Sequence, residues 1–343
     1  GGRSHFGSSQ REQREERGGV PRARRPDPPI MQASEALVAL SEGDLAARAE
    51  ALAALEGCAA AVLEGAQVVA GLASASPAAR AAAALCLGNL GPEAAGKAGD
   101  VAALLGDAAE DLSWVPLQVG GGAERAPIAM RKPRCAALFA LGAMGSAAHA
   151  GRIADLLGDP DWEVRLCACE ALAGLGGAAK DAAGRVAGLL DDDTYPVRAK
   201  ACACLGALGA EDQADKVAEL LEDPAQCVRA EAAYALGAMG EAGTQYCNDI
   251  CKLLGDPSNN VRAAAVAALS GLGEAAHPYA SIIVQLLNDP AADVRAAACL
   301  ALGQMGQYGK AFEEEVRAIA YDMDPDVKAN ASVALDQMKA IAA

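Results

Sequence analysis

The sequence predicts an all-α fold, a right-handed α-solenoid of about eight helical pairs with a closing C-terminal helix. The first observation is the composition: alanine and leucine dominate the apolar residues, and aromatic residues make up only 3% of the chain. This composition favours close-packed helices over sheets. The second is a repeated text, which reads DPDWEVRLCACEALAGLG from Asp159 and recurs in related form from Asp223, Asp256 and Asp289. The third is the set of helix start and stop signals inside each copy.

The copies align on one basic residue, which follows a valine in most of them. Successive anchors are separated by 31 to 33 residues, except for one interval of 54, which indicates 21 extra residues in the third copy. Leucine stands seven residues after the anchor in all nine copies, and glycine stands eleven residues after it in seven of them. The anchors are Arg48, Arg80, Arg134, Arg165, Arg198, Arg229, Arg262, Arg295 and Lys328.

Each copy reads as a short helix, a turn and a longer helix. In the longer helix, the valine before the anchor and the apolar residues seven and ten positions after it form one stripe. The glycine at the eleventh position is expected to end that helix, and an Asp-Pro turn separates it from the preceding "LL". Because one such pair cannot bury its stripe alone, the copies are expected to stack on each other.

Two segments depart from the repeat. Residues 1–30 are rich in Gly, Arg, Pro and Ser and are expected to form a disordered tail, with the solenoid spanning residues 31–343. Met31 is a plausible natural start; the rival interpretation, an Arg-rich transit peptide, is opposed by four acidic residues in the tail. The extra residues of the third copy predict an inserted loop at about residues 107–127.

Charge and cysteine content restrict the partners. The net charge of −16 opposes nucleic acid binding and favours basic or neutral protein surfaces. The eleven cysteines, mostly within helical text, indicate free buried thiols in an intracellular reducing compartment, most simply the cytoplasm. No run of eighteen apolar residues occurs, so no membrane span is expected.

The text D-P-x-x-x-V-R-x-x-A-x-x-A-L-G-x-[LM]-G, complete or nearly so in four copies, resembles the HEAT-repeat family in its phycobilisome-lyase-type variety. The resemblance covers about residues 34–343. It implies an armadillo-like helical fold and a structural role for the repeated Asp and Arg positions. The degenerate first copy, and the last helix with Asp336 and Lys339 near its end, are expected to be solvent-facing caps.

Candidates for chemistry are few, and the prediction is no catalytic residue, no cofactor and no metal. Cys167 and Cys169, like Cys202 and Cys204, are two positions apart, which on a helix directs them to different faces and disfavours a zinc site. The di-iron enzyme deoxyhypusine hydroxylase, built on a similar solenoid, uses repeated His-Glu pairs. This sequence has no His-Glu pair and only three histidines. For a bilin lyase, the other enzyme alternative, no residue of this chain can be assigned a role.

The insertion and its neighbourhood form the predicted partner-binding site. Trp162 and Tyr195 hold the same repeat position on the next two turns, so they are expected to lie on one ridge with the insertion. Tryptophan, tyrosine and arginine are enriched at binding hot spots, although both aromatic residues could simply cover the ends of their own helices. The predicted partner-binding residues are Trp114, Arg125, Arg131, Lys132, Trp162 and Tyr195.

The sequence therefore predicts a non-catalytic scaffold or adaptor that binds protein partners through its ridge and concave face. The alternative is an enzyme or enzyme subunit of bilin-lyase type.

Overall fold

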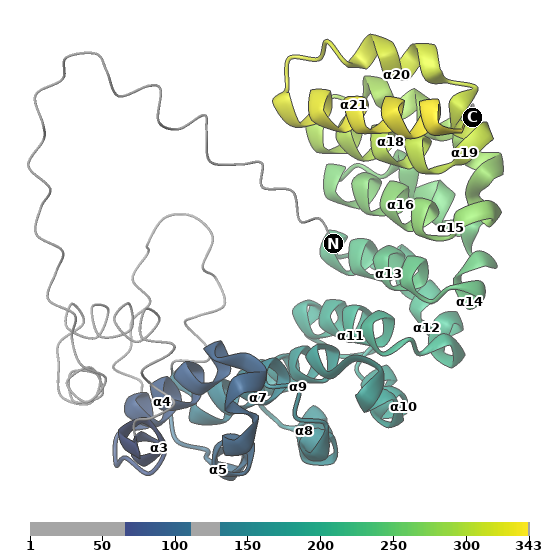
Figure 1. Ribbon diagram of the computed structural model, residues 1–343. Helices are drawn as coiled ribbons and strands as arrows, with labels where there is room; N and C mark the ends of the chain where they lie inside the picture. Colours follow the sequence, from purple (N-terminus) through teal and green to yellow (C-terminus); the bar gives the residue numbers. More distant parts are fainter. Residues whose placement is uncertain (1–65, 111–130, 342–343) are drawn as a thin grey trace, which may run out of the picture. The chain divides into compact units, whose positions relative to one another are not determined.

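The computed structural model describes residues 66–110 and 131–341, all within the unit that spans residues 32–343. These residues form helices joined by turns, and no strand occurs among them (Figure 1). Three predicted segments lie outside the described residues: the tail, the first repeat copy and most of the insertion, which includes Trp114 and Arg125. The all-α solenoid predicted from the repeat is confirmed.

Each repeat unit pairs a short first helix with a longer second helix. The second helices are α4 (Pro77–Asn89), α7 (Pro133–Ala143), α9 (Trp162–Leu175), α11 (Tyr195–Leu208), α13 (Gln226–Ala238), α16 (Asn259–Gly271), α18 (Ala292–Gln304) and α21 (Pro325–Ala340). The shorter helices are α3 (Ala66–Gly71), α5 (Ala98–Ala102), α8 (Ala150–Asp155), α10 (Ala183–Ala187), α12 (Ala214–Glu219), α14 (Glu241–Thr244), α15 (Cys247–Lys252), α17 (Ala280–Ile283), α19 (Gly306–Lys310) and α20 (Glu313–Ile319). Short 3₁₀ turns, such as Leu156–Gly158 and Leu253–Gly255, extend the first helices toward the Asp-Pro turn.

The second helices pack side by side in chain order, and the core lies between them and the first helices (Figure 1). The predicted stripe is buried in every described copy except the last, where Leu335 is partly exposed. In α11, for example, Val197 and Leu205 are fully buried and Leu208 is 2% exposed. Each second helix therefore covers the apolar side chains of its neighbours.

Glycine ends the second helices where the sequence places it. Gly209 after α11 adopts φ +61°, in the left-handed region that an L side chain adopts only with strain. The same repeat position has φ between 56° and 66° in all seven copies that carry glycine. The predicted helix stop is confirmed.

A second glycine position, eight residues after the anchor, sets how closely the second helices approach. A Cβ atom on Gly237 of α13 would lie 2.7 Å from the Cα of Ala268 in α16. A Cβ on Gly206 of α11 would lie 2.9 Å from the Cα of Ala235 in α13. Non-bonded carbon atoms prefer about 3.5–4.0 Å, so only glycine leaves room for this backbone contact.

Candidate functional site

The repeated Asp and Arg residues bind each other from one copy to the next. The guanidinium of Arg229 donates to both carboxylate oxygens of Asp256, at 2.8 Å and 3.0 Å, 27 residues further along the chain. It also donates to the backbone carbonyls of Asp223 and Pro224 in its own copy. The same bidentate pattern joins Arg165 to Asp192, Arg198 to Asp223, Arg262 to Asp289 and Arg295 to Asp322.

These Asp–Arg pairs have a structural role, as predicted from the sequence. Asp256 also accepts a hydrogen bond from the backbone N–H of Ser258, and its side chain is only 6% exposed. Burial acts to raise the pKa of Asp256, but the hydrogen bonds from Arg229 and Ser258 outweigh it and leave the pKa below its ordinary value. The pKa is also lowered at Asp192, Asp289 and Asp322.

Acid is expected to remove the stabilisation that these pairs supply. A carboxyl group whose pKa is lower in the folded chain stabilises the fold above its unfolded pKa, and this stabilisation is lost as pH falls through the folded pKa. For Asp256 the loss begins near its ordinary pKa of 3.8. The Tm difference between wild type and Asp256→Asn, measured by circular dichroism from about pH 5 to about pH 2.5, should shrink as pH falls. A Tm difference that grows as the pH falls would contradict the expected loss of stabilisation in acid.

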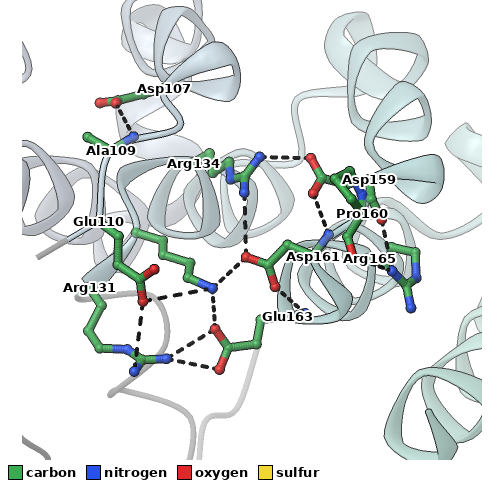
Figure 2. Close-up of polar contacts among 11 residues, drawn as sticks. Asp107, Ala109, Glu110, Arg131, Arg134, Asp159, Pro160, Asp161, Glu163 and Arg165 are labelled. Atoms are coloured by element: carbon green, nitrogen blue, oxygen red, sulfur yellow. Dashed lines mark hydrogen bonds and ion pairs between the residues drawn. The ribbon is translucent and has the colours of Figure 1, made fainter. Parts of the chain in front are cut away.

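A cluster of paired charges lies where the inserted segment meets the next repeat. Arg131 donates to both carboxylate oxygens of Glu163, at 2.9 Å and 3.1 Å, and Lys132 Nζ lies 2.5 Å from Asp161 Oδ2 and also contacts Glu163. Glu110, on the other side of the insertion, lies 3.9 Å from Arg131 and 4.0 Å from Lys132. Figure 2 shows Glu110, Arg131, Asp161 and Glu163 turned toward one another. The cluster thus joins both ends of the insertion to the turn before α9.

Lys132 is the buried centre of this cluster, with a side chain 9% exposed. Burial lowers the pKa of Lys132, but its hydrogen bonds to Asp161 and Glu163 raise the pKa above its ordinary value, so the ammonium stays charged at neutral pH. Burial raises the pKa of Asp161, and the hydrogen bonds from Lys132 and the Glu163 backbone lower it by more. The positive charges of Arg131 and Lys132 are therefore balanced by carboxylates within the protein.

The structure places four of the six predicted partner-binding residues. Trp162 and Tyr195 are the first residues of α9 and α11, and their residues are 38% and 54% exposed. Arg131 and Lys132 contact Asp161 and Glu163, the two residues that flank Trp162. Tyr195 lies one repeat further on, and within residues 66–110 and 131–341 its ring stacks on no other aromatic ring. Three of the predicted residues thus gather at one turn.

Eight of the ten described cysteines are buried; Cys227 is exposed and Cys251 is partly exposed. Burial raises the pKa of Cys204 to about 12, and burial also raises the pKa of Cys227 and Cys251. Across residues 66–110 and 131–341, no group of three or more His, Cys, Asp or Glu side chains is placed to hold a metal ion. These thiols are packing residues of the helices.

One serine–histidine contact occurs near the start of α8. Ser146 Oγ and His149 Nδ1 lie 2.9 Å apart, three residues apart in the chain. A nucleophilic serine needs a base that a third group orients. No described carboxylate contacts His149, so this contact has no orienting acid in the part of the chain that the structure describes.

A groove of about 670 Å³ crosses four neighbouring second helices, α13, α16, α18 and α21. All of its lining residues belong to these helices, so it opens on the face that the second helices expose, which we call the inner face. Small residues of α16, including Ala263 and Ala267, line it. Tyr234 of α13 and Leu300 of α18 also line it, and the Tyr234 residue is 47% exposed.

The groove is lined by carboxylates but by no Lys or Arg side chain. Glu231, Asp293 and Asp326 line it, and none of the three forms an ion pair with a described cation. Asp293 accepts a hydrogen bond of 2.9 Å from the Asn259 amide, which is a neutral donor. Burial, followed by the charges of Glu231 and Asp293, raises the pKa of Tyr234. The groove is therefore electronegative as well as partly apolar.

None of the groove residues is among the six predicted partner-binding residues, although the sequence contains a signal for them. They occupy the repeat positions two before, and one, two and five after, the anchor, such as Asp293, Ala263, Glu231 and Tyr234. The position one after the anchor is alanine in most copies, whereas the other three positions vary between copies. This variation marks Glu231 and Tyr234 as polar and aromatic side chains at positions that the repeat does not fix.

Comparisons with known proteins agree with the repeat. The family profile described as "HEAT repeats" matches residues 130–196 and 182–270, and the profile described as "HEAT repeat" matches residues 281–309. The comparison with curated proteins found no match. In the described ranges, no helix combines the length and the hydrophobicity needed to cross a bilayer.

One solved structure with low sequence identity shares the fold, and two others align with lower scores. Kap121p bound to Pho4p aligns with a TM-score of 0.61 at 14% identity, covering 90% of this chain and 37% of that one. An engineered protein aligns with a TM-score of 0.47 at 18% identity, covering 90% of this chain and 98% of that one. The complex of CpcE and CpcF of phycocyanin lyase from Nostoc sp. PCC7120 gives 0.46 at 22% identity, covering 79% and 93%. At 14% identity the likeness to Kap121p concerns the fold alone.

Proposed function

The chain is a HEAT-repeat protein, and on that premise we propose that it is a non-catalytic scaffold or adaptor that binds protein partners through its inner face and its ridge. The observation that carries the proposal is the groove across α13, α16, α18 and α21. There Tyr234 and Leu300 are accessible beside carboxylates that the described residues leave without ion pairs. Such a surface has both apolar area and charge to offer a partner.

The ridge is the second proposed contact surface. It comprises the insertion with Trp114 and Arg125, the cluster residues Arg131 and Lys132, and Trp162 and Tyr195. Exposed tryptophan and tyrosine supply large contact areas at a small cost in side-chain entropy. Because Arg131 and Lys132 are paired with Asp161 and Glu163, their proposed role is to hold the insertion beside Trp162. A reducing compartment such as the cytoplasm suits a chain whose cysteines are mostly buried in helices.

The ridge is tested with Trp162→Ala. The partner is first captured on the immobilised full chain and identified by mass spectrometry, and its affinity for wild type and variant is then measured by calorimetric titration. A hot-spot residue loses about 2 kcal/mol or more on truncation, so the Kd should rise about thirtyfold. Gln226→Ala is the matched control, because Gln226 is also the exposed first residue of its helix, α13.

The control should change the affinity less than twofold. An unchanged affinity for Trp162→Ala and for Tyr195→Ala would remove the ridge from the proposal and leave the inner face as the binding surface. Absorbance from a tetrapyrrole that purifies with the protein would contradict the scaffold and favour a bilin enzyme.

A further inference from the structure

We propose that the groove binds an extended, lysine- and arginine-rich peptide segment of a protein partner. The inference rests on the proposed scaffold function and adds the chemical class of the partner. It starts from two properties of the groove. Its lining contains carboxylates but no Lys or Arg side chain, and it also contains apolar residues.

The charge of the lining selects a cationic partner. Glu231, Asp293 and Asp326 are distributed over three helices, α13, α18 and α21, and none of them forms an ion pair with a described Lys or Arg side chain. The repeated aspartates of the turns are paired by contrast, as Asp256 is with Arg229. Carboxylates that face one groove repel each other, and a basic side chain from outside relieves this repulsion. The net charge of −16 adds long-range attraction for such a partner.

The apolar residues that line the groove can pack against the methylene groups of lysine and arginine side chains. These side chains bury their methylene groups on apolar surface while keeping the charged group near water or a carboxylate. Ala263, Ala267 and Leu300 supply the apolar surface. The exposed ring of Tyr234, beside Glu231, supplies a face for a cation–π contact with an ammonium or guanidinium group.

The amides in the lining suit an extended backbone. Asn260 of α16 and Asn330 of α21 line the groove, and Asn260 is exposed. An amide side chain both donates and accepts, so it can bind the N–H and C=O groups that an extended peptide leaves unpaired. In a helical peptide the backbone N–H and C=O groups bind each other, so few of them would be left to bind Asn260 and Asn330.

The helix spacing predicts the spacing of the basic residues. Packed helices lie about 8–10 Å apart, and an extended chain rises about 3.3 Å per residue, so a peptide that crosses the row advances about three residues per helix. Glu231 and Asp293 are two helices apart, and Asp293 and Asp326 are one helix apart. A matching segment therefore has basic residues about six and then about three positions apart.

The first experiment measures binding of a synthetic peptide by fluorescence anisotropy. The probe is a labelled peptide of about twelve residues with lysine or arginine at every third position, and its twin has glutamate at those positions. The basic peptide should bind the full chain at low salt, more weakly at high salt, and the acidic twin should not bind. No binding of the basic peptide at low salt would overturn the proposal.

Two triple variants with equal change in net charge separate the groove from general attraction. The groove variant combines Glu231→Gln, Asp293→Asn and Asp326→Asn. The control combines Glu219→Gln, Glu241→Gln and Glu274→Gln, which are exposed residues outside the groove. The groove variant should raise the Kd about tenfold or more and the control about twofold or less, with both folded by circular dichroism. Equal changes would assign the binding to net charge and overturn the proposal.

Cys227 reports occupancy of the groove directly. It lines the groove and is exposed, whereas Cys251 lies on the first helix α15 and is partly exposed. Alkylation of each thiol is followed by mass spectrometry with and without saturating basic peptide. The peptide should slow alkylation of Cys227 several-fold and leave Cys251 unchanged. Equal rates at Cys227 with and without peptide would place the peptide elsewhere.

Tyr234→Ala distinguishes failure of this inference from failure of the scaffold function. If the captured partner binds this variant more weakly while the basic peptide does not bind wild type, the partner class is wrong and the scaffold function stands. If no captured partner depends on Tyr234 or on the ridge residue Trp162, both proposals fail. Tyr234→Phe should keep the affinity of the basic peptide within about twofold, because the ring face remains.

Discussion

Leu205→Ala is expected to lower the free energy of unfolding by about 2–5 kcal/mol. Leu205 is fully buried in α11, which packs between α9 and α13. Truncation removes apolar contacts on both sides and leaves a cavity that the backbone cannot close, because neighbouring helices hold α11 in place. Urea titration followed by circular dichroism measures the loss.

The control is the same substitution at the same repeat position of the last helix. Leu335 is partly exposed, and α21 has one second-helix neighbour, α18. Leu335→Ala should therefore cost less than Leu205→Ala, since fewer contacts are lost and water already reaches the site. Equal losses would contradict a stack in which each helix depends on its nearest neighbours.

Gly237→Ala is expected to destabilise the protein by about 1–3 kcal/mol, although alanine is the better helix former. The new Cβ would lie 2.7 Å from the Cα of Ala268 and 3.1 Å from its Cβ. The Cα of Ala268 belongs to the helix backbone and cannot rotate away, so α13 and α16 must separate to admit the methyl group. The strain outweighs the roughly 0.5–1 kcal/mol that alanine gains over glycine inside a helix.

Gly151→Ala is the matched control for the destabilisation expected of Gly237→Ala. Gly151 lies in α8, and a Cβ built there meets no atom within 4 Å. This substitution should be neutral or slightly stabilising in the same urea titration, because only the helix propensity changes. A stabilising effect of Gly237→Ala would show that the second helices separate without cost.

Part of the candidate site followed from the sequence. The repeat alignment placed Trp162 and Tyr195 at equivalent turns of neighbouring copies, and in the structure they are the exposed first residues of α9 and α11. The sequence did not predict the ion pairs that Lys132 forms with Asp161 and Glu163. About thirty residues separate these partners in the chain, and only the stacking of α7 on α9 brings them together.

The sequence by itself determined the helices, their ends and the stripe that each one buries. These features depend on local chemistry: apolar spacing places Leu205 in the core, and the positive φ at Gly209 needs glycine whatever surrounds it. Tertiary structure alone decided which copies touch and how closely. The bond from Arg229 to Asp256 in the next copy, the approach of Gly237 to Ala268 and the groove beside Tyr234 all depend on the offset between stacked helices. That offset is the joint result of packing along the row, so no single repeat encodes it.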